Sequence, residues 1–198
     1  FQGQIDIPLN DNGKRQAFAT RNFLSQEEIN KAYSSSLSRP FETAKIILES
    51  HKKLEIVLKE DLIEIGHGLW EGKLESEIKK GWPEILKAWK ENPDSVSMPQ
   101  GETLQEVWRR SVKCWNAISK ELRDNETALV VAHDAVNKTI LCHLLGLSAA
   151  DIWMIKQGNG GVTVIDISRD NKQPDVVTCL NLTSHLGSIL DCTAKGAL

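Results

Sequence analysis

The sequence feature that most constrains the fold is the apolar run Ala-Leu-Val-Val-Ala at residues 128–132, which ends at His133. Such a run is typical of a strand buried on both faces of a parallel sheet, and a helical pattern at 136–145 follows it directly. Strand and helix patterns alternate along the rest of the chain as well, which predicts an α/β fold in three layers, with helices on both faces of a largely parallel sheet. The other expected elements are helices at 12–24, 38–50, 74–91 (broken near 81–83) and 103–123, and strands at 31–34, 54–58, 161–167 and 176–182.

The composition excludes several classes of protein. Over 198 residues, 24 Lys and Arg against 27 Asp and Glu give a net charge of −3, so no basic field attracts nucleic acid or an anionic membrane. No run approaches the roughly 18 apolar residues of a membrane span. The four cysteines lack C-x-x-C spacing, so we expect no metal site, no disulfide framework and a cytoplasmic protein. The seven-residue spacing of Trp82 with Trp89 and of Trp108 with Trp115 indicates helix packing and not base stacking.

Two side chains at the predicted strand ends are candidates for binding an anion. His133 lies where a strand meets a helix, at the sheet edge where ligands bind and where helix amides face anions. The alternative for His133 is a simple helix cap. Arg39 lies in the first turn of the helix that follows strand 31–34, where the helix dipole disfavours a cation, so anion binding would explain its place. The alternative for Arg39 is an ordinary solvated arginine.

A glycine-rich loop at 61–72 carries the candidate general acid. Glu64 is flanked by apolar residues there, a setting that raises the pKa of a carboxylate toward the range of a general acid. The alternative is a loop acid bonded to backbone amides, and Glu71 competes with Glu64 for the catalytic role. The pairs Lys79-Lys80 and Arg109-Arg110 are interpreted as solvated surface, with the alternative that one pair lines the mouth of a pocket. Residues 101–103, Gly-Glu-Thr, are interpreted as a helix start.

Taken in order, these segments resemble the histidine phosphatase superfamily, also called phosphoglycerate mutase-like. The matching motifs are Phe-Gln-Gly at 1–3, the Ser-Ser-x-Leu-x-Arg-x-x-x-Thr-Ala pattern within 34–44, the acid loop at 64–72, Gly-Glu-Thr at 101–103, and His133. Residues 130–137 and the helix around Trp108 and Trp115 resemble cyanobacterial two-domain members and plastid carboxyarabinitol phosphate phosphatase within that family.

The resemblance implies hydrolysis of phosphomonoesters, or mutase activity, on small phosphorylated sugars or acids through a phosphohistidine, with no cofactor and no metal. By this resemblance, Arg39 and His133 bind the phosphoryl oxygens, and Glu64 protonates the leaving oxygen and later deprotonates water. Four more residues fall at positions that bind phosphate or substrate: Gln2, Gly3, His67 and Asp134.

The chain departs from the family pattern in two places. The Arg-His-Gly motif that carries the nucleophile occurs nowhere in these residues, and Asp134 stands where the family usually has Gly. Asp134 could repel phosphate or orient His133. We therefore expect residues 1–188 to form a domain that lacks its first strand and nucleophile, as a fragment of an active parent, with a frayed tail at 189–198. The alternative is a catalytically dead pseudophosphatase that serves as a phosphate-binding or interaction module.

Overall fold

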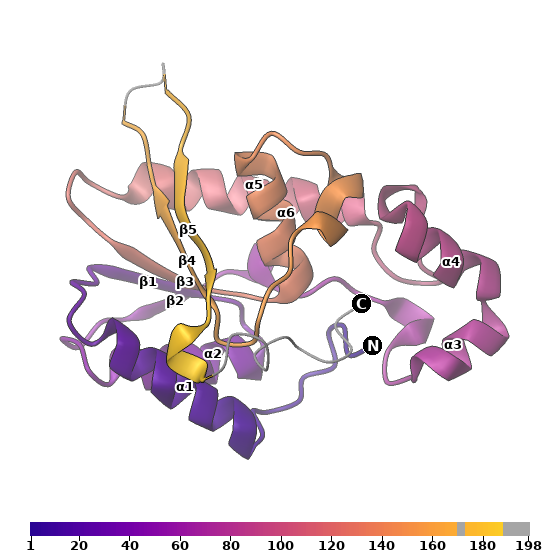
Figure 1. Ribbon diagram of the computed structural model, residues 1–198, viewed down its shortest axis with the longest axis horizontal. Helices are drawn as coiled ribbons and strands as arrows, with labels where there is room; N and C mark the ends of the chain where they lie inside the picture. The colour runs from indigo at the N-terminus through magenta and orange to yellow at the C-terminus, as the bar shows by residue number, and fades with distance from the viewer. Residues whose placement is uncertain (170–172, 188–198) are drawn as a thin grey trace.

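The computed structural model describes residues 1–169 and 173–187. Its centre is a parallel sheet with the strand order β2-β1-β3, in which β1 (Lys31–Ser34) pairs with β2 (Ile56–Leu58) on one side and β3 (Ala128–Val131) on the other. Helices α1 (Asp11–Leu24) and α2 (Ser38–Leu48) lie on one side of this sheet, whereas α5 (Leu104–Glu121) and α6 (Asp134–Leu144) lie on the other (Figure 1). The predicted α/β class with helices on both faces of the sheet is confirmed.

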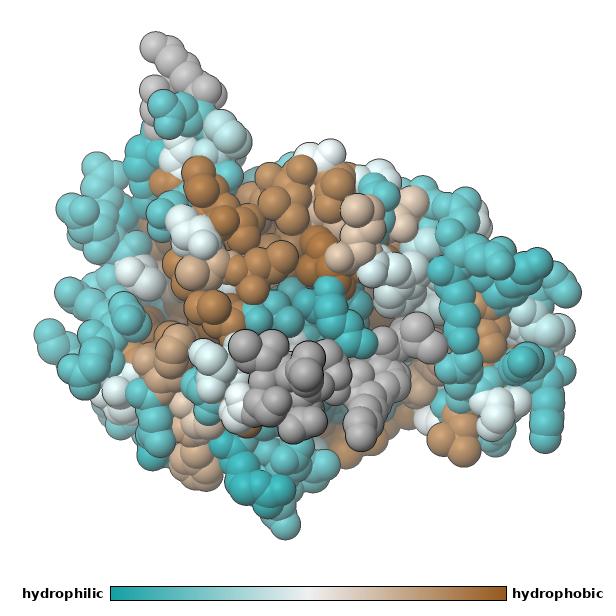
Figure 2. All heavy atoms as spheres, viewed as in Figure 1, coloured by the Kyte–Doolittle hydropathy of each residue, from teal (hydrophilic) through white to brown (hydrophobic). Residues whose placement is uncertain are grey.

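The two late strands differ from the expectation of a largely parallel sheet. Strand β4 (Val162–Asp166) pairs antiparallel with β5 (Val176–Leu182), and among the described residues these two strands form a separate ribbon. The connection between them is shorter than the dozen or so residues that a parallel crossover needs, so only antiparallel pairing is open to them. Figure 2 shows apolar side chains gathered over this ribbon, which exposes Val164, Val176 and Leu180.

Local signals explain where the remaining helices begin and end. The predicted helix 74–91 is two helices, α3 (Glu75–Gly81) and α4 (Pro83–Glu91), because Pro83 takes the first position of a new helix. Helix α5 begins after Thr103, whose Oγ accepts from the N–H of Glu106 while the Glu106 carboxylate accepts from the N–H of Thr103. Helix α6 begins two residues earlier than predicted, directly after His133.

The core lies between the sheet, α5, α6 and the loop before α3. Its largest fully buried side chains include Trp70, Trp89, Leu62 and Leu104. The expectation that the tryptophans pack in the interior is confirmed, because Trp89 and Trp115 are buried and Trp82 and Trp108 pack against the same cluster. Short 3₁₀ turns complete the chain at Glu60–Leu62, Gly68–Trp70, Pro93–Ser95, Ala149–Met154 and Ser184–Leu186. The tail predicted at 189–198 lies outside the described residues.

A membrane-crossing helix is not found within residues 1–169 and 173–187, since none there is both long and apolar enough.

Candidate active site

A cavity of about 340 Å³ lies at the carboxyl ends of the parallel strands. Arg39 reaches it from the first turn of α2, after β1, and Asp134 reaches it from the first turn of α6, after β3. This is the edge at which the sequence predicts ligand binding. The wall is completed by residues from the N-terminal segment, the acid loop and the two Trp-bearing segments: Phe1, Gln2, Gly3, Glu64, Ile65, His67, Trp89, Ala135, Lys138, Ile152 and Trp153.

Arg39 is a cation held in place without a carboxylate partner. Its Nη1 donates to the carbonyl of Ile7 at 3.2 Å, and within the described part of the chain no carboxylate lies at ion-pair distance from its guanidinium. Asp6 instead accepts hydrogen bonds from the N–H and Oγ of Ser38, each at 2.7 Å, which lower its pKa and cap α2. An arginine with spare donors on a cavity wall is suited to bind a phosphoryl group.

His133 is buried and uncharged at neutral pH. Burial, together with the nearby positive charges of Arg39 and Arg110, lowers the pKa of His133 to about 3. Its Nε2 lies 3.0 Å from Oγ of Ser35, at the end of the neighbouring strand. His133 does not itself line the cavity, but it lies next to Asp134, which does, and within electrostatic range of Arg39.

Glu64 has the properties of a general acid. Its carboxylate is buried and accepts a hydrogen bond from the N–H of Ile65 at 2.9 Å. Burial and, to a lesser extent, the charge of Asp134 raise the pKa of Glu64 to about 7. Hydrogen bonds from the backbone of Ile65 and Ala135 act in the opposite direction. A carboxyl group with a pKa near 7 can both give and take a proton at neutral pH.

The competing candidate, Glu71, holds the loop instead of lining the cavity. Its Oε1 accepts from the backbone N–H of Gln4 at 2.9 Å and of His67 at 3.0 Å. The same oxygen lies 2.2 Å from the place that a Cβ on Gly3 would occupy, and Gly3 has a φ of +55°. Glycine at position 3 therefore lets the N-terminal segment approach Glu71, and it brings Gln2 and Gly3 to the cavity wall.

His67 also lines the cavity, between aromatic rings. Its ring meets that of Phe1 edge-on, with centroids 5.0 Å apart, and its Nδ1 lies 2.9 Å from Sδ of Met98. Burial lowers the pKa of His67 to about 4, so this imidazole is neutral at neutral pH.

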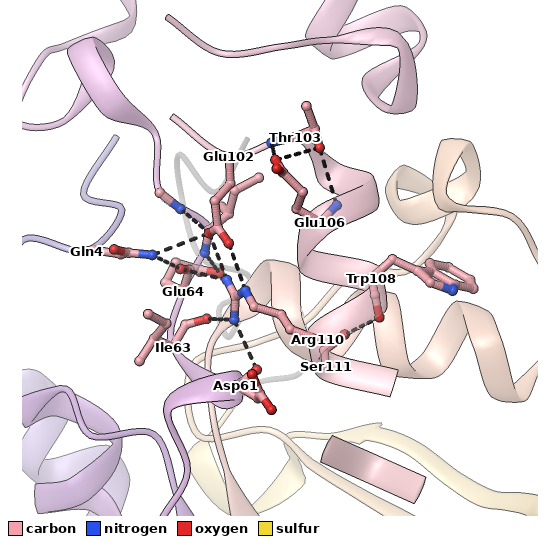
Figure 3. A network of polar contacts seen from close by, with 12 residues as sticks. Gln4, Asp61, Ile63, Glu64, Glu102, Thr103, Glu106, Trp108, Arg110 and Ser111 are labelled. Atoms are coloured by element: carbon pink, nitrogen blue, oxygen red, sulfur yellow. Dashed lines mark hydrogen bonds and ion pairs between the residues drawn. The ribbon is translucent and has the colours of Figure 1, made fainter. Parts of the chain in front are cut away.

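Arg110 is a residue that the sequence interpretation placed wrongly, on a solvated face. Figure 3 shows its guanidinium enclosed by Glu102 and by backbone carbonyls of the acid loop. Nε and Nη2 donate to the two oxygens of Glu102, each at 2.9 Å, while the remaining N–H groups donate to the carbonyls of Asp61, Ile63 and Glu64 at 2.6–3.0 Å. Arg110 thereby fixes the backbone that carries Glu64.

Glu102 completes this network, so Gly-Glu-Thr at 101–103 is more than a helix start. Besides Arg110, its Oε2 accepts from the N–H of Gly66 at 2.8 Å and from Nε2 of Gln4 at 3.3 Å. Gln4 donates to the carbonyl of Glu64 as well, at 3.0 Å. The only sequence signal for the pair is opposite charge at positions 102 and 110, eight positions apart.

Asp134 lies on the cavity wall and does not orient His133, one of the two roles considered from the sequence alone. It forms an ion pair with Lys138, whose Nζ lies 2.8 Å from Oδ2, and it makes no hydrogen bond to His133. The side chain of Lys138 is 3% exposed. Sequence reasoning missed Lys138, because a lysine on a helix usually faces solvent.

Residues 1–179 match the sequence profile of the histidine phosphatase superfamily (branch 1). Phosphoserine phosphatase 1 of Hydrogenobacter thermophilus is 35% identical over 187 residues, which are 94% of this chain and 86% of that protein. The probable 2-carboxy-D-arabinitol-1-phosphatase of Arabidopsis thaliana is 33% identical over 184 residues, which are 91% of this chain and only 37% of that protein. Among solved structures, Bacillus stearothermophilus YhfR superposes with a TM-score of 0.87 at 27% identity, over 94% of this chain and 90% of its own.

Proposed function

Because the chain belongs to the histidine phosphatase superfamily, branch 1, a family of phosphomonoesterases, we propose that its cavity binds the phosphoryl group of a small phosphorylated sugar or acid. The observation that carries this proposal is the presence, in one cavity, of Arg39, which has no carboxylate partner among the described residues, and of Glu64, whose pKa burial raises to about 7. The first supplies fixed positive charge for the phosphoryl oxygens, and the second supplies a proton for the leaving oxygen.

The proposed reaction has two steps. A histidine nitrogen attacks phosphorus, the ester P–O bond breaks, and the proton of Glu64 goes to the departing alkoxide oxygen. Water then attacks phosphorus, the P–N bond breaks, and Glu64 takes a proton from that water. Arg39 offsets the charge on the phosphoryl oxygens in both steps.

The attacking histidine is proposed to come from an Arg-His-Gly segment of the parent protein. These 198 residues contain no Arg-His-Gly. The same observation favours a second candidate function, a phosphate-binding module without turnover. Assay of the 198-residue chain and of the parent protein on p-nitrophenyl phosphate in EDTA separates the two. Turnover by the parent that is lost when its Arg-His-Gly histidine is changed supports the enzyme, and binding without turnover by both supports the module.

Titration calorimetry of the 198-residue chain with inorganic phosphate tests the binding step itself. We expect Arg39→Met to weaken phosphate binding by roughly tenfold or more, since a hydrogen bond to a charged group contributes about 1.5–3 kcal/mol. Lys45→Met is the matched control, because Lys45 is an exposed cation on the same helix. If both variants bind phosphate as tightly as the unmodified chain does, the proposal is wrong.

A further inference from the structure

An ion pair between a buried lysine and a partly exposed aspartate forms part of the cavity wall. The ammonium of Lys138 lies between Oδ2 of Asp134, at 2.8 Å, and the ring of Trp153, whose centroid is 4.8 Å away. All three residues line the cavity, although the Lys138 side chain is only 3% exposed. The positive charge of Lys138 is therefore held at the wall by an anion and an aromatic face, with its aliphatic stem in the interior.

Stability is a poor explanation for this pair. Removing the Lys138 ammonium from water costs about as much as its attraction to the partly exposed Asp134 returns, so the pair contributes little net free energy of folding. The pair is also incompletely satisfied. An ammonium has three N–H groups, and Asp134 is the one hydrogen-bond acceptor that the described residues offer it. Asp134 in turn keeps a buried Oδ1 that has no donor within the described part of the chain. Incomplete pairing on a cavity wall points to a ligand.

The cavity wall carries two cations that come from different helices, so it can bind a second anionic group of a ligand besides the phosphoryl group. Arg39 reaches it from α2, and Lys138 reaches it one helical turn beyond Asp134 on α6. The aromatic residues Trp89, Trp153 and Phe1 form the apolar part of the same wall. A volume of about 340 Å³ accommodates a phosphoryl group together with a short carbon chain.

We propose that Lys138 binds a carboxylate of the phosphomonoester, an inference that rests on the proposed function. Asp134 is the counter-ion that holds the Lys138 ammonium when the cavity is empty. The substrate is then a phosphorylated acid that carries its two anionic groups on one short chain. Lys138 and Asp134 are its specificity-determining residues.

Binding of matched pairs of phosphomonoesters to the 198-residue chain tests this inference. 3-Phosphoglycerate and glycerol 3-phosphate differ in a carboxylate against a hydroxymethyl group, and O-phosphoserine and O-phosphoethanolamine differ in a carboxylate against hydrogen. We expect the carboxylated member of at least one pair to bind tenfold more tightly or better, on the order of one charge-assisted hydrogen bond. The pair that shows the preference identifies the acid as a hydroxy acid or an amino acid.

Two variants change the preference in opposite directions. Lys138→Met keeps the length of the side chain without its charge and brings the ratio of affinities to about one. Asp134→Asn removes the anion that competes for Lys138 and raises the ratio of affinities above that of the unmodified chain. This second variant tests the inference even if Lys138→Met does not fold. Equal affinities within both pairs, or a preference that neither variant moves, overturns the inference.

Inorganic phosphate distinguishes this failure from failure of the proposed function. Arg39→Met is expected to weaken all four esters and inorganic phosphate by the same factor. If inorganic phosphate binds and Arg39→Met weakens that binding while the ester pairs show no preference, only the inference about Lys138 is wrong. If inorganic phosphate does not bind at all, the proposed function is wrong, and this inference with it.

Discussion

Arg110 binds both carboxylate oxygens of Glu102, each at 2.9 Å, and the same guanidinium donates to three backbone carbonyls of the loop that carries Glu64. One planar group thus joins helix α5 to the acid loop. Because all of its N–H donors are used within the chain, Arg110 is a positioning residue and not a phosphate ligand.

Arg110→Met should destabilise the fold. The substitution leaves a largely buried carboxylate and three carbonyls without donors, so the free energy of unfolding is expected to fall by about 3 kcal/mol. Arg109→Met is the control, because Arg109 is exposed on the same helix, and it should change the free energy of unfolding by less than about 0.5 kcal/mol. Urea unfolding of the two variants measures the difference, and equal midpoints would contradict the role given to Arg110.

Glu64→Gln should stabilise the chain at alkaline pH. The pKa of Glu64 is about 7 in the folded chain against an ordinary value of 4.5, so between these values the folded state holds more protons than the unfolded state. The stability contributed by this proton is complete below pH 4.5 and is lost as the pH rises through 7. Glutamine resembles the protonated acid, so the variant should exceed the unmodified chain by about 3 kcal/mol at pH 8 and match it near pH 4.5. Glu60→Gln, an exposed change in the same segment, is the control for urea unfolding at both pH values.

His133→Gln should reduce the loss of stability in acid. The pKa of His133 is about 3 in the folded chain, against an ordinary value of 6.5. Between these two pH values the unfolded state binds a proton at His133 and the folded state does not. This contribution to the free energy of unfolding is present in full above pH 6.5. About 2 kcal/mol of it is lost when the pH falls to 5. The pH dependence of stability that His133 contributes is opposite in sign to the one that Glu64 contributes. The contribution of His133 is therefore measured as the difference in stability between the variant and the unmodified chain. His143→Gln, an exposed change on the same helix, should lose as much stability as the unmodified chain between pH 7 and pH 5.

Gly3→Ala should disturb the cavity through the N-terminal segment. An added Cβ would lie 2.2 Å from Oε1 of Glu71, and a φ of +55° adds about 1 kcal/mol of strain for a residue with a side chain. We expect lower stability and weaker binding of inorganic phosphate. Gly81→Ala is the matched change, since nothing lies within 4 Å of its added Cβ at the end of α3, and it should leave phosphate affinity unchanged. Normal phosphate affinity in Gly3→Ala would show that this segment does not shape the site.

The parts of the fold that were predictable are those fixed by local pattern. Helix α5 was expected at 103–123 because its apolar residues recur at helical spacing and Thr103 can cap it, and it spans Leu104–Glu121. The run at 128–132 likewise gave β3. The antiparallel pairing of β4 with β5 was missed, because two apolar runs look alike whichever strand each of them pairs with.

The same division holds for the site. Arg39 and Glu64 stood out because each is unusual in its local setting, and both line the cavity. Arg110 and Lys138 looked like ordinary helical cations, since nothing nearby in the sequence marks them as buried. The carbonyl partners of Arg110 lie 46 to 49 positions away, and Lys138 becomes a wall residue only when Trp153 packs beside it. Contacts of that kind are properties of the assembled fold.

The edge-to-face packing of Trp89 and Trp153, with ring centroids 5.3 Å apart, gives the cavity an optical signal of its own. Only these two of the six tryptophans line it. A ligand that displaces water from beside their indole rings, or that draws the ammonium of Lys138 away from Trp153, changes the surroundings of two emitters directly. Intrinsic fluorescence should therefore report occupancy of the cavity without any added label.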